Sequence, residues 1–232
     1  MQKIIGFCGL IGSGKDSAAD YLCNNYGFVR DSFAASLKDA VAMVFGWDRT
    51  LLDGRTSEAR EWREKIDTWW AKRLNLPHLT PRWVLQQWGT EVIRVAFHDD
   101  IWIASMEARL QRSDTHTVIS DVRFPNEITA IRRAGGRIYR VQRGADPYWL
   151  TLAERANNGD TKSLAQLNAM KIHASERAWA GYPMDGFIEN NGTLDEFHEK
   201  IKQLVESPES TPLASRVDLG FEVAVGNWHK LS

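Results

Sequence analysis

The sequence predicts an α/β fold, in which helices cover both faces of a central parallel sheet as a three-layer sandwich. Two observations lead to this prediction. Short β-rich runs are followed by helical runs along most of the 232 residues, as in βαβ units. A glycine-rich turn joins the first of these strands to the first helix. The length suits one domain with a full core, and the hydrophobic content of 43% is ordinary for a globular protein.

The first strand-to-helix connection is a glycine-rich loop that carries a lysine. Residues 3–8 form the expected strand, residues 9–17 read Gly-Leu-Ile-Gly-Ser-Gly-Lys-Asp-Ser, and a helix follows. Gly12 and Gly14 allow several backbone N–H groups to point at one phosphate, and Lys15 adds a mobile positive charge. The sequence therefore predicts a phosphate site here. The alternative is a tight glycine turn without a ligand.

The residue after this lysine departs from the usual pattern. A serine or threonine hydroxyl normally ligates magnesium at this position, but this chain has Asp16, and the hydroxyl comes one residue later on Ser17. Neighbouring helical residues point about 100° apart, so Ser17 does not take the same place. We expect Asp16 to hold Mg²⁺ through its own oxygens or through water, because carboxylates are ligands of hard cations.

The composition limits the classes of function. The net charge is −1, so no global field recruits nucleic acid or a membrane. Arginines gather locally instead, as at Arg60 and Arg63, which suits small anionic ligands. No apolar run approaches the ~20 residues of a membrane span, and the N-terminus lacks a signal-peptide core. With Cys8 and Cys23 expected to be reduced packing thiols, we expect a cytoplasmic protein.

The next segments add one phosphate candidate and an insert. Residues 28–33 predict a second strand, and residues 34–45 predict a helix with Lys38 in its first turns. Ligands of open α/β sheets gather at the carboxyl ends of strands, so Lys38 is a candidate phosphate contact. The alternative is a solvated surface lysine. Residues 47–75 predict a helical insert, with Trp62, Trp69 and Trp70 on its apolar side and no chemistry of its own.

Residues 80–94 predict a capped helix that runs to about residue 88 and carries several polar side chains. An amide beside an aromatic ring suits a nucleobase, since the ring stacks and the amide bonds to the base edge. The alternative is an amphipathic helix with Trp83 in the core. The candidates in this segment are Arg82, Gln86, Glu91 and Arg94.

Residues 117–127 predict a buried strand that ends in Asp121, followed by a helix that Pro125 opens. A carboxylate at a strand end beside a phosphate loop commonly holds the water shell of magnesium. Arg123 points to the same side of an extended chain and can clamp a phosphate with two hydrogen bonds. Asn126 and Glu127 lie at the mouth of the helix. The alternative is that Asp121 only caps a turn or a helix.

Residues 137–142 predict the next strand, and a long polar stretch follows at residues 144–183. A stretch of this length between two strands favours a lid, which would carry arginines to the transferring phosphoryl group. Its candidates are Arg143, Trp149, Arg155 and Arg177. The alternative is a helical excursion with solvated arginines.

Residues 186–190 predict the last parallel strand, and residues 194–205 predict a closing helix. Asn190 and Gly192 lie in the connection, where loops often border the adenine of ATP. The tail from residue 207 onward carries no motif, and its weak alternation is compatible with an edge strand.

Together these segments resemble the deoxynucleoside monophosphate kinases of tailed bacteriophages, a branch of the nucleoside monophosphate kinase group of P-loop proteins. The matching runs follow one another in family order over most of residues 1–205. They are residues 12–17, 35–38, 85–86, 88–91, 94, 121–127, 173–176, 190 and 192–194.

The resemblance implies a P-loop kinase domain at residues 1–206, with a helical insert at about 47–110, a lid at about 144–183, and a C-terminal tail at 207–232. It implies transfer of the γ-phosphoryl group of ATP, with Mg²⁺, to deoxynucleoside 5′-monophosphates. The products would be deoxynucleoside diphosphates and ADP, as precursors for DNA synthesis. If the chain is encoded by a phage, the reaction takes place in the host cytoplasm.

The candidate residues then fall into four roles. Those for catalysis are Lys15, Arg123 and Arg143, and those for ATP are Gly12, Ser13, Gly14, Lys15, Asp16, Ser17, Asn190 and Gly192. Those for the metal are Asp16, Ser17 and Asp121. Those for the acceptor are Lys38, Arg82, Gln86, Glu91, Arg94, Asp121, Arg123, Asn126, Glu127, Trp149, Arg155 and Arg177.

Two other functions stay open. One is a kinase of the same fold for another phosphorylated metabolite, such as dephospho-coenzyme A, and the other is a non-catalytic nucleotide-binding module. The sequence contains no Asn-Lys-x-Asp run that would read guanine, which argues against a GTPase switch. It does not specify the accepted bases, and it leaves a homodimer open.

Overall fold

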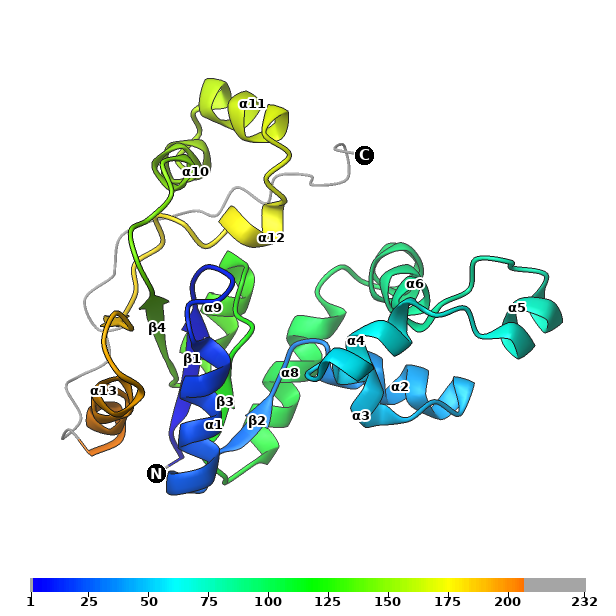
Figure 1. The fold of residues 1–232 in the computed structure, drawn as a ribbon, viewed down its shortest axis with the longest axis horizontal. Coiled ribbons are helices and arrows are strands. Elements are labelled where there is room, and N and C mark those ends of the chain that lie inside the picture. Colours follow the sequence, from blue (N-terminus) through cyan, green and yellow to red (C-terminus); the bar gives the residue numbers. More distant parts are fainter. Residues whose placement is uncertain (1, 207–232) are drawn as a thin grey trace.

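The computed structural model describes residues 2–206, which form a parallel sheet with helices on both faces (Figure 1). The order of the strands across the sheet is β2-β3-β1-β4-β5, and every neighbouring pair is parallel. This confirms the predicted α/β class. The tail at residues 207–232 lies outside the described residues. The strands are β1 (Ile4–Cys8), β2 (Val29–Asp31), β3 (Thr117–Ile119), β4 (Arg137–Gln142) and β5 (Gly186–Glu189).

Helices occupy most of the chain between the strands. They are α1 (Lys15–Tyr26), α2 (Ala35–Phe45), α3 (Arg49–Asp53), α4 (Ser57–Glu64), α5 (Thr68–Leu74), α6 (Pro81–Gln86), the π-helix η1 (Gln87–Val92), α7 (Ile93–Ala96), α8 (Ile101–Arg112), α9 (Pro125–Arg133), α10 (Trp149–Asn157), α11 (Thr161–Ala169), α12 (Ala174–Arg177) and α13 (Leu194–Glu206). None of the helices within residues 2–206 is long and apolar enough to cross a membrane.

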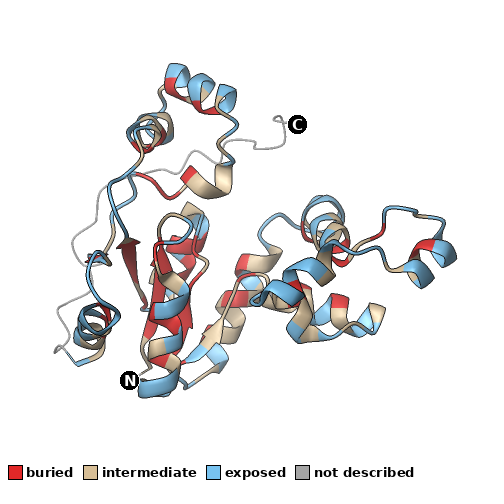
Figure 2. Cartoon of the chain, in the orientation of Figure 1, coloured by how far each residue is buried: buried red, intermediate tan, exposed pale blue. Residues whose placement is uncertain are grey.

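The two faces of the sheet pack against different helices. Successive side chains of a strand point to opposite faces, so Ile5 and Phe7 of β1 pack with α1 and α13, while Ile4 and Cys8 pack on the other side with α8 and α9. All five residues of β1 are buried, and Figure 2 shows the central strands buried as well. Burial on both faces explains why this strand is a continuous apolar run.

The segment between β2 and β3 has a core of its own. Helices α2 to α6 extend to one side of the sheet (Figure 1) and bury Leu37, Val41 and Leu52 with a set of tryptophans around them. The sequence places three tryptophans on one apolar side, but only Trp62 and Trp70 pack against this core, whereas Trp69 is 63% exposed. Adjacent helical residues point about 100° apart, so neighbours cannot both face the core.

The order of the strands fixes where a ligand can bind. The chain leaves β1 toward β2 on one side and leaves β3 toward β4 on the other. Open α/β sheets bind ligands at such a switch point, outside the carboxyl ends of the strands. Two connections start at this edge, namely residues 9–14 after β1 and residues 120–124 after β3. The candidate site is built from them.

Candidate active site

The loop after β1 presents backbone donors at the start of α1. Gly12 and Gly14 have φ angles of 76° and 107°, which L side chains rarely adopt. Gly14 is the N-cap of α1 and supplies no side chain to cap it. The first N–H groups of the helix are therefore left for a ligand, and the helix dipole favours an anion there.

The side chain of Lys15 lies over this loop. Its Nζ donates to the carbonyl oxygens of Gly9 at 2.9 Å and Leu10 at 2.7 Å. Burial lowers the pKa of this ammonium below its ordinary value, and the neighbouring carboxylate of Asp16 opposes that shift. The charge of Lys15 is thus held within reach of any anion that the loop binds.

A cavity of about 450 Å³ opens at the loop and collects most of the residues predicted for ATP. Asn190 fastens the end of β5 to the loop, because its Nδ2 donates to the carbonyl oxygen of Ser13 at 2.9 Å. A Cβ on Gly14 would lie 2.4 Å from that Nδ2, so only glycine permits the contact. Among the predicted residues, the lining includes Gly12, Gly14, Lys15, Asp16, Ser17, Asp121, Arg123, Arg143, Asn190 and Gly192.

Two carboxylates and a hydroxyl meet between the loop and the end of β3. The Oδ1 of Asp16 accepts from Ser120 Oγ at 2.8 Å and from Arg30 at 3.1 Å. The Oδ1 of Asp121 is buried and has no hydrogen-bond partner. Burial raises the pKa of Asp121, while the positive charges of Lys38 and Arg123 lower it.

This arrangement fits the metal that the fold family implies. A buried carboxylate oxygen without a partner is a free ligand position. Among the described residues no cluster of three or more His, Cys, Asp or Glu side chains forms a metal cage. Magnesium does not require one, since it commonly binds through one or two carboxylates together with water and substrate phosphates.

Glu127 holds the connection that follows Asp121. Its Oε2 accepts from the backbone N–H groups of Arg123 at 2.7 Å and Phe124 at 3.0 Å. Burial raises the pKa of Glu127 to about 7, and the charge of Asp121 acts in the same direction. The structure thus places this residue, predicted for the acceptor, where it positions the backbone of Arg123. Neighbouring Asn126 is exposed and accepts from the N–H of Glu127.

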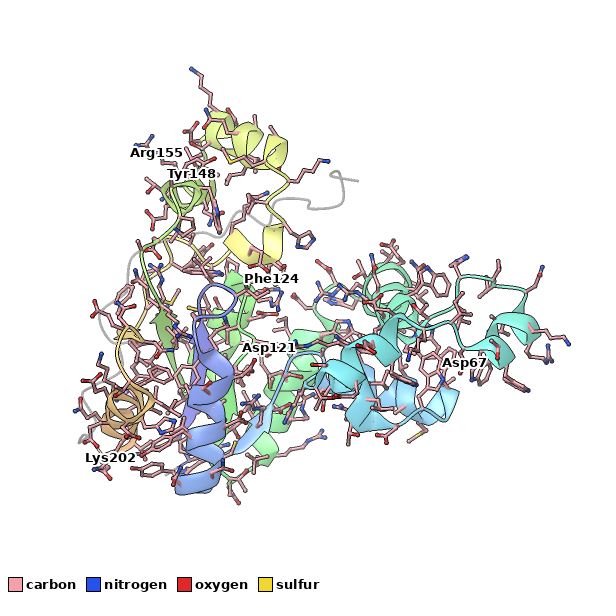
Figure 3. All side chains as sticks on the ribbon, viewed as in Figure 1. Asp67, Asp121, Phe124, Tyr148, Arg155 and Lys202 are labelled. Carbon is pink, nitrogen blue, oxygen red and sulfur yellow. The ribbon has the colours of Figure 1, made fainter. Side chains whose placement is uncertain are left out.

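Arg123 lies between the sheet and the segment predicted as a lid. Its guanidinium is half exposed and lies 3.4 Å from Ser175 Oγ and 3.9 Å from Glu176, at helix α12. Contact between residues so far apart in the chain brings α12 to the edge of the cavity. In Figure 3, Asp121 and Phe124 lie near each other beside α9, and Arg155 lies away from them on α10.

A second cavity, of about 650 Å³, lies between the end of β2 and helices α2 to α4. It shares four lining residues with the first, namely Asp16, Ser120, Asp121 and Arg123. Lys38 lines it as well, and its Nζ donates to Asp53 at 2.9 Å. The sequence interpretation assigned no chemistry to residues 47–75, although it noted that the local charge at Arg60 and Arg63 suits small anionic ligands. The further basic residues of this wall are Arg30, Arg49, Arg55, Arg60 and Arg63.

Several predicted acceptor residues lie elsewhere. Arg82 is exposed and pairs with Glu64 at 2.8 Å. Arg177 is buried and donates to the carbonyl oxygen of Ile172 and to Asn168, so it closes a turn of its own segment. The helix at residue 81 runs into a π-helix after Gln86 instead of ending near residue 88. Of the residues predicted for ATP, Ser13 is buried and lines neither cavity. The residues predicted for the acceptor that line neither cavity are Arg82, Gln86, Glu91, Arg94, Asn126, Glu127, Trp149, Arg155 and Arg177.

The fold and the site define the class of the protein. A parallel sheet carries a lysine-bearing phosphate loop after β1 and a carboxylate after the adjacent strand β3. These are the parts of a P-loop kinase. Nearby arginines and a lysine complete a set of groups that suits the transfer of a phosphoryl group, which needs positioning and charge neutralisation more than covalent chemistry.

The relatives of known name are viral kinases. A protein of Acanthamoeba polyphaga mimivirus, named a deoxynucleotide monophosphate kinase, is 28% identical over 218 residues, which cover 88% of this chain and 96% of that protein. The deoxynucleoside-5′-monophosphate kinase of Escherichia phage T5 is 42% identical over 55 residues, or 23% of this chain and 22% of the phage protein. The chain is a homologue of these viral kinases, which confirms the predicted resemblance. No family model matches it.

Solved structures align with most of this chain, but their structural similarity to it is low. TT1252 from Thermus thermophilus has a TM-score of 0.41 at 17% identity, over 90% of this chain and 99% of its own. Dephospho-CoA kinase from Campylobacter jejuni has a TM-score of 0.36 at 14% identity, over 88% of this chain and 96% of its own. At these scores the overlaps say nothing about the substrate.

Proposed function

We propose that this protein transfers the γ-phosphoryl group of ATP to deoxynucleoside 5′-monophosphates, which gives deoxynucleoside diphosphates and ADP as precursors for DNA synthesis. The observation that carries the proposal is the pair of cavities with a common wall, formed by Asp16, Ser120, Asp121 and Arg123. A donor in the first cavity and an acceptor in the second would meet at this wall, as an in-line transfer requires. The names of the viral relatives favour a deoxynucleotide as acceptor.

The first cavity is assigned to ATP. The N–H groups of the loop and of the first turn of α1 bind the β- and γ-phosphates, and Lys15 neutralises their charge. Asn190 and Gly192 border the adenine side. Asp16, Ser17 and Asp121 are the groups that would hold Mg²⁺, directly or through water. The ion, when bound, supplies positive charge to the phosphate oxygens.

The second cavity is assigned to the acceptor. Lys38 and Arg123 line it and are proposed to hold the acceptor phosphate. Arg143 lines the first cavity and forms no ion pair with a carboxylate of residues 2–206, so it is the lid residue we assign to the transferring group. In this scheme residues 47–110 form the acceptor side, residues 144–183 form the lid, and the reaction takes place in the cytoplasm, where ATP and nucleotides are found.

A coupled assay of ADP release tests the proposal. Wild-type protein is given Mg²⁺, ATP and each of the four deoxynucleoside monophosphates, with dephospho-coenzyme A as a competing acceptor. We expect turnover with at least one monophosphate, and loss of that turnover in Lys15→Ala but not in Lys162→Ala, an exposed lysine of α11. Turnover with dephospho-coenzyme A alone would indicate a different metabolite kinase. ATP binding without any transfer would indicate a binding module.

A further inference from the structure

The insert lines the second cavity with three arginines that form no ion pair within the described part of the chain, although carboxylates such as Asp39 and Asp53 line the cavity as well. Four of the basic side chains in this wall form ion pairs, and they are Arg30, Lys38, Arg49 and Arg123. Arg55, Arg60 and Arg63 line the same cavity and form no ion pair with a carboxylate of residues 2–206. All three belong to helix α4 or to the turn that precedes it. This segment therefore presents three arginines without ion pairs among the described residues to the cavity.

The guanidinium groups of Arg60 and Arg63 are oriented by backbone carbonyl oxygens. Arg60 Nε donates to Gly54 O at 3.1 Å, and one Arg63 nitrogen donates to Leu52 O at 3.4 Å. The Nε of Arg63 is buried and has no hydrogen-bond partner. A buried charged donor without a partner is costly. Since the side chain lines the cavity, an anionic ligand bound there would relieve this cost.

Gly54 creates the space in which Arg63 lies. This glycine ends α3 with a φ angle of 64°, and a Cβ on it would lie 2.2 Å from Cζ of Arg63. The flat guanidinium thus packs on the bare α-carbon, and any larger residue would displace it. Arg63 is consequently held at the cavity by its surroundings before any ligand arrives, which lowers the entropic cost of binding.

The electrostatics of Arg63 agree with an anion site. Burial lowers the pKa of its guanidinium, and the nearby positive charges of Arg82 and Arg60 lower it further. Arginine stays protonated in proteins even so. The carboxylates of Glu64 and Asp53 oppose this shift, so the lowered pKa reports mainly the burial of the guanidinium, a cost that an anionic ligand beside it would relieve.

We infer that Arg55, in the turn between α3 and α4, and Arg60 and Arg63 of α4 form the phosphate clamp for the acceptor nucleotide. This inference rests on the proposed function, and it adds residues that the sequence interpretation left out. A nucleoside monophosphate carries a doubly charged phosphate, whose oxygens match the forked donors of arginine. Lys38 is paired with Asp53, whereas these three arginines form no ion pair with a carboxylate of residues 2–206.

Binding measurements on purified full-length protein test the clamp. Calorimetric titrations use a deoxynucleoside monophosphate, the matching deoxynucleoside without phosphate, and a non-hydrolysable ATP analogue. We expect Arg63→Ala to weaken binding of the monophosphate on the order of tenfold or more, with no change for the deoxynucleoside or the ATP analogue. Arg63→Lys should recover only part, because an ammonium cannot form two parallel hydrogen bonds. Arg73→Ala is the control, an exposed arginine on α5 of the same insert.

The outcomes separate this inference from the proposed function. Wild-type affinity for the monophosphate in both Arg63→Ala and Arg60→Ala overturns the clamp, even when the wild type turns over. A clamp effect in a protein that transfers no phosphate supports the clamp and overturns the proposed function. If the wild type binds no monophosphate, both fail. If Arg63→Ala does not fold, as judged by circular dichroism, Arg63→Lys and Arg60→Ala decide the question.

Discussion

Arg109 of α8 joins the insert to the sheet, and its replacement by alanine tests how firmly the two are held. The guanidinium binds the carboxylate of Asp31 with two nitrogens, at 2.9 Å and 3.0 Å. It also donates to the hydroxyls of Ser36 and Ser105 and to the carbonyl oxygen of Ser32. Asp31 and Ser32 line the second cavity. One side chain thus connects the end of β2, the start of α2 and α8.

The expected cost follows from burial and geometry. Removal of one partner of a fully buried ion pair costs about 3–5 kcal/mol. Arg109 and Asp31 keep 30% and 18% of their side-chain surface, so water compensates part of the loss. The two serine hydroxyls lie 2.7 Å apart and can bond to each other. We therefore expect Arg109→Ala to lower the free energy of unfolding by about 2–3 kcal/mol, and Tm by about 4–12 °C.

Urea denaturation followed by tryptophan fluorescence measures this loss. Arg109→Lys should lose about half as much, because it keeps the charge but not the two-nitrogen contact. Arg112→Ala, an exposed arginine one turn further along α8, should stay within about 0.5 kcal/mol of the wild type. A loss below about 1 kcal/mol for Arg109→Ala, or equal losses for the alanine and lysine variants, would refute the reasoning.

Three further predictions concern the site. The pKa of Glu127 is about 7 in the folded protein, against 4.5 for an ordinary glutamate carboxyl. The wild type should therefore lose up to about 3 kcal/mol of unfolding stability as the pH rises between these values. Glu127→Gln should lack this loss in urea titrations at pH 5 and 7.5, and an unchanged loss would contradict the assignment. Asn190→Ala removes the hydrogen bond to the carbonyl oxygen of Ser13. Since such a bond contributes about 1 kcal/mol, we expect calorimetry to show about fivefold weaker binding of an ATP analogue. Unchanged affinity would show that this hydrogen bond does not shape the phosphate loop for ATP. Arg143→Ala should lower turnover without changing Tm, whereas Arg177→Ala should lower Tm through its lost buried hydrogen bonds. A lower Tm for Arg143→Ala with normal turnover, and lower turnover for Arg177→Ala with normal Tm, would contradict both assignments.

Local chemistry made much of the fold readable from the sequence. The phosphate loop needs only backbone N–H groups, glycines and a lysine within a few consecutive residues, and the run from Gly9 to Ser17 shows all of them. Strands β1 and β3 appear as short, largely apolar runs because both of their faces are covered. The helix at Pro125 and the cap at Thr193 are likewise local, since a helix end is set by the residues next to it.

The second cavity could not be read in this way. Its wall depends on α3 and α4 folding back toward Lys38 and Asp121, and periodicity alone makes Arg60 and Arg63 look like a solvated helix face. Arg82 and Arg177 show the opposite case, since they carry a suitable charge but bind Glu64 and backbone of their own segment. The sequence shows which side chains are charged, whereas the packing of the fold determines which partner neutralises each charge.

By itself, the sequence determined the α/β class, the place of the phosphate loop and the kind of chemistry, because each rests on neighbouring residues and on periodicity. Only the tertiary structure decided that the loops after β1 and β3 meet, that two cavities share Asp16 and Asp121, and that the arginines of the insert face one of them. The physical reason is that side chains distant in the chain come together through the burial of the sheet and of the insert's own core, and burial acts on whole surfaces, not on single motifs.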